Sequence, residues 1–185
     1  MNKHIIKQPE FNGLVAKICR EVTLSNWKPD YVVGITRGGL LPAVMISHYL
    51  GVPMNTLNIS LRDGGESESN LWMAEDAYGY ADASEVPRPE DEPTTDPALR
   101  KNILVIDDIN DTGATINYLM EDWPSGCMST DPAWEDIWNQ NVKFAVVVDN
   151  LASKCNVKMD FVGMEVNKAE NDVWIEFPYE EWWTK

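Results

Sequence analysis

Two carboxylates followed by a turn of small residues form the stretch of this sequence best suited to chemistry. Segment 103–115 reads ILVIDDINDTGAT, an apolar run that ends at Asp107 and Asp108 and leads into a turn. The turn consists of Asp111, Thr112, Gly113, Ala114 and Thr115. Its hydroxyls and backbone N–H groups precede a helical pattern, so it can hold an anion. Because carboxylates repel phosphate, we expect Asp107 and Asp108 to face ribose hydroxyls or a divalent cation.

A second polar turn has the residues of an anion site. The segment TRGG at 36–39 lies between an apolar strand pattern and an apolar helical run. The glycines let the backbone approach a ligand closely, and the guanidinium of Arg37 offers a bidentate fork for an anion. This turn repeats the strand, loop and helix order of segment 103–115.

Short β-branched apolar runs predict the strands that must position these turns. The run 103–106 is continuously apolar, as in a central strand of a parallel sheet that is covered on both faces. Its carboxylates then follow the strand's C-terminal end, where open α/β sheets place their ligands. Further strands are expected at 31–35, 54–61, 142–148, 159–165 and 172–179, and helices at 9–22 and 40–50. The predicted fold class is α/β, with a mainly parallel open sheet flanked by helices, a small hood from the C-terminal or N-terminal part of the chain, and an acidic flexible loop.

The motif IDDINDTGAT resembles the phosphoribosyl-pyrophosphate (PRPP) motif of type I phosphoribosyltransferases, and TRGGLLP resembles their pyrophosphate loop. The alternative is an ordinary strand-to-helix turn capped by Asp and Thr. The resemblance implies one phosphoribosyltransferase domain over 1–185. That domain would transfer a 5-phosphoribosyl group from PRPP to a purine and release pyrophosphate. The nearest resemblance is to the bacterial xanthine-guanine and hypoxanthine phosphoribosyltransferases.

The resemblance also implies roles for individual residues. Asp111 matches the general base proposed near purine N7, and Asp107 and Asp108 would bind the ribose hydroxyls directly or through Mg²⁺. The residues implied in PRPP binding are Arg37, Gly38, Asp107, Asp108, Asp111, Thr112, Gly113, Ala114 and Thr115. The reaction would pass through an oxocarbenium-like transition state from which water must be excluded.

The acceptor base is expected at a C-terminal hood over about 159–185. Segment 172–179, DVWIEFPY, resembles the nucleobase end of the bacterial xanthine-guanine enzymes. That resemblance implies that Trp174 stacks on the purine and that the backbone of Ile175 contacts it. The alternative is that Trp174 has only a packing role within the hood. Purine members place a lysine after the strand matching 142–148, where this chain has Asn150, with Lys154 further on. Because an amide donates and accepts, we expect a 6-oxopurine or broader purine specificity, with weaker discrimination between hypoxanthine, guanine and adenine than a lysine would give.

Segment 62–99 is rich in acidic residues and proline. It is interpreted either as a solvated excursion or as a flexible lid that keeps water from the reacting centre. The formal net charge of −15 argues against nucleic acid as a partner. The three cysteines lack metal-binding spacing and indicate a reducing compartment.

No apolar leader or membrane-spanning run is visible in the sequence, so a cytoplasmic location is expected. A homodimer or homotetramer is also expected, with the tryptophan-rich segments as possible contacts. Two further classes of function stay open. One is a regulator that binds PRPP or a nucleotide without catalysis, and the other is a purely structural or partner-binding protein.

Overall fold

The computed structural model describes residues 2–59, 61, 70–80 and 95–184. Within these residues, five parallel strands form one open sheet in the order β3-β2-β4-β5-β6. The strands are β2 (Tyr31–Thr36), β3 (Met54–Asn58), β4 (Ile103–Asn110), β5 (Val142–Asn150) and β6 (Phe161–Val166). The α/β fold class and the mainly parallel sheet predicted from the sequence are confirmed.

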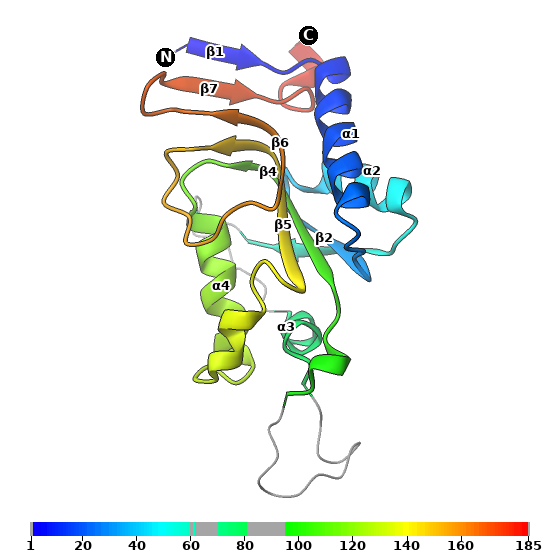
Figure 1. Cartoon of the computed structure of the whole chain (residues 1–185). Coiled ribbons are helices and arrows are strands. Elements are labelled where there is room, and N and C mark those ends of the chain that lie inside the picture. Colours follow the sequence, from blue (N-terminus) through cyan, green and yellow to red (C-terminus); the bar gives the residue numbers. More distant parts are fainter. Residues whose placement is uncertain (1, 60, 62–69, 81–94, 185) are drawn as a thin grey trace, which may run out of the picture.

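Helices cover both faces of the sheet (Figure 1). The helices are α1 (Gln8–Leu24), α2 (Leu40–Leu50), α3 (Leu71–Tyr78) and α4 (Ala114–Gly126), with short 3-10 turns at η1 (Pro97–Leu99), η2 (Pro132–Asp136) and η3 (Trp182–Thr184). The central strand β4 sends Ile103 and Val105 to the side of α3 and α4, and Leu104 and Ile106 to the side of α1 and α2. This two-sided burial is the reason for its unbroken apolar run.

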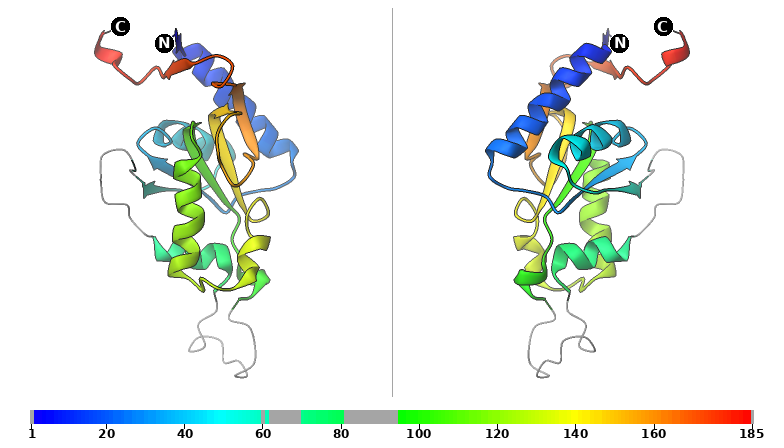
Figure 2. Two further views of the ribbon diagram at one scale, coloured as in Figure 1. Left: turned by 90° about the vertical axis from the view of Figure 1, so that its left-hand side faces the viewer. Right: turned by 90° about the vertical axis from the view of Figure 1, so that its right-hand side faces the viewer.

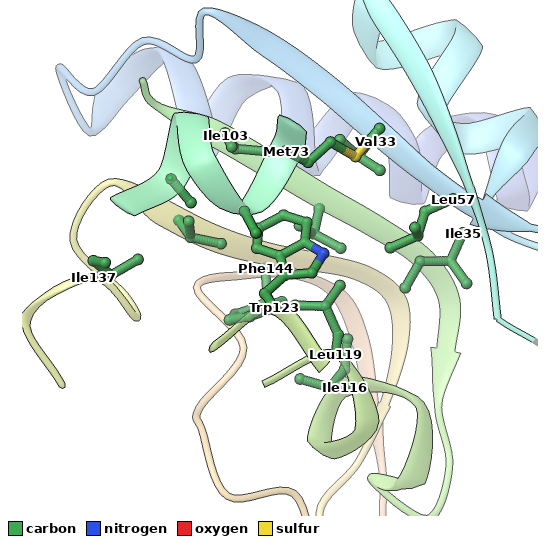
Figure 3. Packing of buried hydrophobic residues seen from close by; sticks show 14 of the residues in the cluster. Val33, Ile35, Leu57, Met73, Ile103, Ile116, Leu119, Trp123, Ile137 and Phe144 are labelled. Carbon is green, nitrogen blue, oxygen red and sulfur yellow. The ribbon is translucent and has the colours of Figure 1, made fainter. Parts of the chain in front are cut away.

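Large side chains fill the core between the sheet and the helices α3 and α4 (Figure 3). Trp123 and Leu119 of α4 and Met73 of α3 are almost fully buried there. The tryptophans of the segment after α4 join the same core, because Trp134 stacks on Tyr78 and on Trp138. Trp134 and Trp138 therefore contribute to folding rather than forming an exposed patch.

Helix α3 lies inside the acidic segment 62–99. One side of this helix is buried in the core through Met73, Ala74, Ala77 and Tyr78. This part of the segment therefore packs on the core and is not a solvated excursion. The lid stays a prediction, since residues 62–69 and 81–94 of the segment lie outside the described residues.

A small separate sheet stands at the end of the molecule that carries both termini (Figures 1 and 2). Among the described residues it consists of two parallel strands, β1 (Asn2–Ile5) and β7 (Val173–Glu176). Strand β1 joins the predicted C-terminal hood, which therefore contains both ends of the chain. No helix in the described part of the chain is long and apolar enough to cross a membrane.

Candidate functional site

One cleft of about 960 Å³ collects most of the residues singled out in the sequence. It is lined by the ends of β2 and β4, the start of α4, and the hood. The predicted residues that line it are Arg37, Gly38, Asp107, Asp108, Asp111, Thr112, Gly113, Ala114, Thr115, Trp174 and Ile175. Motifs that lie far apart in the sequence therefore share one site.

The turn between β4 and α4 is built to present backbone groups. Gly113 has a φ of 87°, and a Cβ there would lie 2.4 Å from the backbone N of Cys155, so a side chain does not fit. The turn is held from behind, where the N–H of Lys154 donates to the carbonyl of Thr112 at 3.0 Å. Since Thr112–Thr115 line the cleft at the start of α4, the N–H groups at that helix start favour a bound anion.

The two glycines of the TRGG turn lie against β4. A Cβ on Gly38 would come within 1.9 Å of Oδ2 of Asp108, and one on Gly39 within 2.3 Å of the carbonyl oxygen of Ile106. Glycine is therefore required at both positions by close packing of one motif on the other. The peptide bond between Thr36 and Arg37 is cis.

A tyrosine of the hood contacts both motifs. The hydroxyl of Tyr179 donates to Oδ2 of Asp108 at 2.7 Å and lies 3.3 Å from the carbonyl oxygen of Gly38. Its ring stacks on Phe177 with 5.5 Å between centroids. Burial, helped by the negative charge of Asp108, raises the pKa of Tyr179 well above its usual range, so it remains a donor. No role was predicted for this side chain from the sequence.

Asp111, the predicted general base, forms an ion pair with a lysine that the sequence analysis missed. Nζ of Lys168 lies 2.8 Å from Oδ1 of Asp111, and the two side chains are 17% and 26% exposed. Lys168 belongs to the connection between β6 and β7 and lines the same cleft. No local sequence motif identifies Lys168, because its place in the site is evident only from its contact with Asp111, far away in the sequence.

Asn150, expected to meet the base, is buried at 5% exposure and is not among the residues that line the cleft. Its Nδ2 donates to the carbonyl of Asp111 at 2.8 Å. Its Oδ1 accepts from the N–H groups of Ala152 and Lys168 at 3.2 and 3.1 Å. The amide of Asn150 thus ties together the backbones that carry Asp111 and Lys168. Lys154 is exposed and does not line the cleft either.

The hood contributes an aromatic ring and a further cation. Trp174 is 40% exposed and lines the cleft beside the buried Ile175. The parallel pairing of β1 with β7 places Lys3 next to Trp174. Nζ of Lys3 lies 3.2 Å from Oε2 of Glu176. Lys3 is another cleft residue that sequence reasoning missed, since β1 itself was not predicted.

The comparison with known families shows to which family the fold belongs. Residues 1–181 match the family described as Phosphoribosyl transferase domain. The chain belongs to the phosphoribosyltransferase family. The membership predicted from IDDINDTGAT is confirmed.

Similar proteins cover nearly the whole phosphoribosyltransferase chain. The crystal structure of a purine phosphoribosyltransferase from Pyrococcus horikoshii has a similar fold, with a TM-score of 0.63, 21% identity, and coverage of 98% of this chain and 96% of that one. A xanthine-guanine phosphoribosyltransferase of Idiomarina loihiensis is 24% identical over 80% of this chain and 70% of its own. A hypoxanthine-guanine phosphoribosyltransferase of Schizosaccharomyces pombe is 21% identical over 90% and 85%.

The carboxylates of Asp107 and Asp108 could contribute to a site for a metal ion that a bound phosphate compound completes. Among the described residues, no group of three or more His, Cys, Asp and Glu side chains could hold an ion unaided. Mg²⁺ in proteins is commonly held by one or two carboxylates together with substrate phosphates. Asp107 and Asp108 supply such carboxylates at the cleft. Oδ1 of Asp108 accepts from the N–H of Ile109 at 2.8 Å, which fixes that carboxylate.

Proposed function

We propose that this phosphoribosyltransferase is an enzyme that transfers 5-phosphoribosyl from PRPP to a purine and releases pyrophosphate. The observation that carries the proposal is the single cleft in which an anion-binding turn, an arginine-glycine loop, two carboxylates and an exposed indole face come together. The three similar proteins described above are named as purine phosphoribosyltransferases, which supports a purine as the acceptor.

The anion-binding turn would hold the 5′-phosphate. The backbone N–H groups of segment 111–115 and the hydroxyls of Thr112 and Thr115 are the donors at the start of α4. Holding this end of PRPP fixes the anomeric carbon relative to both the leaving group and the attacking nitrogen. Such positioning converts a collision between two substrates into a reaction within one complex.

The TRGG loop would bind the pyrophosphate. Arg37 supplies positive charge and the Gly38 backbone lies directly against Asp108, so both approach the same end of PRPP. Asp107 and Asp108 would bind the ribose hydroxyls directly or hold Mg²⁺. When bound, Mg²⁺ supplies charge that favours departure of the pyrophosphate. Arg37 stabilises the same developing charge from the protein side.

The hood would hold the purine against the ribose. The indole of Trp174 offers a stacking face that suits any purine. The backbone of Ile175 can then donate to and accept from the edge of the base. As a ring nitrogen of the purine bonds to the anomeric carbon, the bond from that carbon to pyrophosphate breaks. The proton on purine N7 passes to the carboxylate of Asp111.

Release of pyrophosphate from PRPP tests this proposal. The purified protein is incubated with PRPP, Mg²⁺ and a mixture of hypoxanthine, guanine, xanthine and adenine, and pyrophosphate is measured over time. We expect release that requires both PRPP and a purine. Tight binding of PRPP without any release would favour a non-catalytic regulator with the same fold, and absence of binding would exclude both.

We also propose a homodimer or homotetramer. Trp182 and Trp183 at the C-terminal side of the hood are 68% and 70% exposed, which is unusual for such large apolar side chains. Light scattering coupled to size-exclusion chromatography would measure the mass in solution. A mass equal to that of one chain would contradict this part of the proposal.

A further inference from the structure

The side chain of Asn150 continues the central sheet beyond the ends of its strands. The ladder between β4 and β5 ends at the pair of Asn110 and Asp149. The carbonyl of Asp111, one residue further along the chain, has no place in that ladder. Nδ2 of Asn150 donates to this carbonyl at 2.8 Å. The turn that begins with Asp111 is thereby fastened to the end of β5.

The same amide also fastens the chain on the other side of β5. The ladder between β5 and β6 ends at the pair of Asn150 and Val166. The N–H of Lys168, two residues further, donates to Oδ1 of Asn150 at 3.1 Å, and the N–H of Ala152 donates to it at 3.2 Å. Asn150 is 5% exposed, so these bonds are shielded from water. A side-chain amide suits this place because one end donates and the other accepts.

Both backbones that Asn150 holds carry a charged group of the cleft. Nζ of Lys168 lies 2.8 Å from Oδ1 of Asp111, and both residues line the cleft. An ion pair whose side chains are 17% and 26% exposed is weakened by solvent screening, so the pair alone does not fix the Asp111 carboxylate. The hydrogen bonds from Asn150 to the two backbones therefore fix the place of that carboxylate.

The rest of the turn, which is proposed to hold phosphate, has contacts of its own. The N–H of Lys154 donates to the carbonyl of Thr112 at 3.0 Å. The backbone of Cys155 lies directly against Gly113. Loss of the Asn150 amide should therefore displace Asp111 and leave the residues after it in place. These two effects can be measured separately, as turnover and as PRPP binding.

We propose that Asn150 is a positioning residue, which holds the carboxylate of Asp111 where it can take the proton from purine N7. The proposal rests on the proposed function, in which Asp111 is the general base. Asn150 is not among the residues that line the cleft, so it acts through Asp111 and not by contact with a substrate. Misplacing a reacting group by about 1 Å can lower a rate about 100-fold, which sets the scale of the expected effect.

Two substitutions remove the link in different ways. Asn150→Ala removes both ends of the amide, whereas Asn150→Asp has nearly the same shape and loses only the donor to Asp111. Single-turnover rates would be measured with saturating PRPP, Mg²⁺ and hypoxanthine, and the dissociation constant for PRPP by calorimetry. Both variants should transfer about 10- to 100-fold more slowly than the wild type, with PRPP binding little changed. A normal rate in Asn150→Ala would overturn the proposal, and so would a loss of PRPP binding as large as the loss of rate.

A double-mutant cycle with Asp111→Asn tests whether Asn150 acts through Asp111. Once the carboxylate is gone there is nothing left to position. Asn150→Ala should then change the rate less than about twofold, because substitutions that act through one group are not additive. A loss as large as in the wild-type background would mean that Asn150 acts by another route, and the proposal would fall.

Asn141→Ala is the matched control. Nδ2 of Asn141 donates to the carbonyls of Ala77 and Lys101 at 2.8 and 3.0 Å, so this amide also ties two backbones together. It lies just before β5, at the opposite end of that strand from Asn150, and does not line the cleft. Asn141→Ala should lower the melting temperature without slowing transfer. Equal slowing in Asn141→Ala and Asn150→Ala would reduce the effect to general loss of stability and overturn the proposal.

Crystal structures of the wild type and Asn150→Ala separate this proposal from the proposed function. Absence of turnover with every base in the wild type would refute the proposed function. Placement of Asp111 by Asn150 would then stand if the variant shows the Asp111 carboxylate displaced and its contact with Lys168 lost. It would fall if Asp111 keeps its position in the variant.

Discussion

Replacing Tyr179 with Phe removes the hydroxyl through which the hood contacts Gly38 of the TRGG turn and Asp108 of the IDDINDTGAT motif. That hydroxyl donates to Oδ2 of Asp108 at 2.7 Å. The ring keeps its stacking on Phe177 and its edge contact with Phe11, so the hood should stay folded. The change therefore tests whether Asp108 must be held in one orientation to bind the ribose or its metal ion.

The size of the expected decrease in kcat/KM for PRPP follows from the hydrogen bonds that Asp108 keeps. A hydrogen bond to a charged group contributes about 1.5–3 kcal/mol when its loss leaves that group buried and unsatisfied. Asp108 keeps the N–H of Ile109 at 2.8 Å and faces an open cleft, so water can replace part of the loss. We therefore expect about 1–2 kcal/mol, equivalent to a decrease of about 5- to 30-fold in kcat/KM for PRPP.

The assay is steady-state pyrophosphate release as PRPP is varied at a fixed, saturating purine concentration. Tyr118→Phe is the matched control, because Tyr118 bonds Asp122 at 3.5 Å on α4 and does not line the cleft. Thermal unfolding of both variants reports on stability. If Tyr179→Phe lowers only the melting temperature and leaves kcat/KM for PRPP unchanged, the hydroxyl secures the hood and does not orient Asp108.

The raised pKa of the same hydroxyl predicts how its contribution to stability depends on pH. The folded pKa of Tyr179 is raised above its ordinary value of 10 by burial and by the charge of Asp108. An acidic group with a raised folded pKa stabilises the fold fully below its unfolded pKa, and this contribution is lost as the pH rises through the folded pKa. The stability difference between wild type and Tyr179→Phe should therefore be constant from pH 6 to pH 9. A difference that shrinks within that window would contradict the assignment of Tyr179 as a protonated donor.

Three other substitutions test separate parts of the site. Asp111→Asn should lower kcat about 10²- to 10⁴-fold, the range for loss of a general base, with the dissociation constant for PRPP measured by calorimetry largely kept. Gly38→Ala should abolish measurable PRPP binding, because its Cβ would lie 1.9 Å from Oδ2 of Asp108, whereas Gly13→Ala on α1, where a Cβ meets nothing within 4 Å, should bind normally. Trp174→Ala should raise KM for the purine about 5- to 150-fold through loss of stacking worth about 1–3 kcal/mol, with KM for PRPP changed far less. Full activity of Asp111→Asn, normal PRPP binding by Gly38→Ala, or an unchanged purine KM in Trp174→Ala would each remove the corresponding role.

The sheet and the turns that follow β2 and β4 in the cleft were predictable because their sequence signals are local. Strand β4 is buried on both faces, so its run 103–106 is apolar at every position and marks a central strand. The glycines at 39 and 113 are required by close backbone approach, which leaves no alternative residue. Such local signals can be recognised in a single sequence.

The hood and the part of the cleft beside it could not be predicted in the same way. Strand β1 has the largely exposed sequence NKHI and exists through its pairing with β7, at the opposite end of the chain. The position after β5 was expected to face the base, yet Asn150 turns inward to tie two loops together. Helix α3 was not predicted either, although a sequence signal for it exists. The helical spacing of Met73, Ala74, Ala77 and Tyr78 indicates a helix despite the acidic surroundings.

Identification of both products from one reaction tests the central claim most directly. The wild-type protein is incubated with PRPP, Mg²⁺ and hypoxanthine, and nucleotide is measured by mass spectrometry alongside pyrophosphate. Transfer in this cleft predicts inosine 5′-monophosphate and pyrophosphate in equal amounts, with formation of both suppressed in Asp111→Asn. Pyrophosphate without any nucleotide from hypoxanthine, guanine, xanthine or adenine, or no product at all, would contradict it.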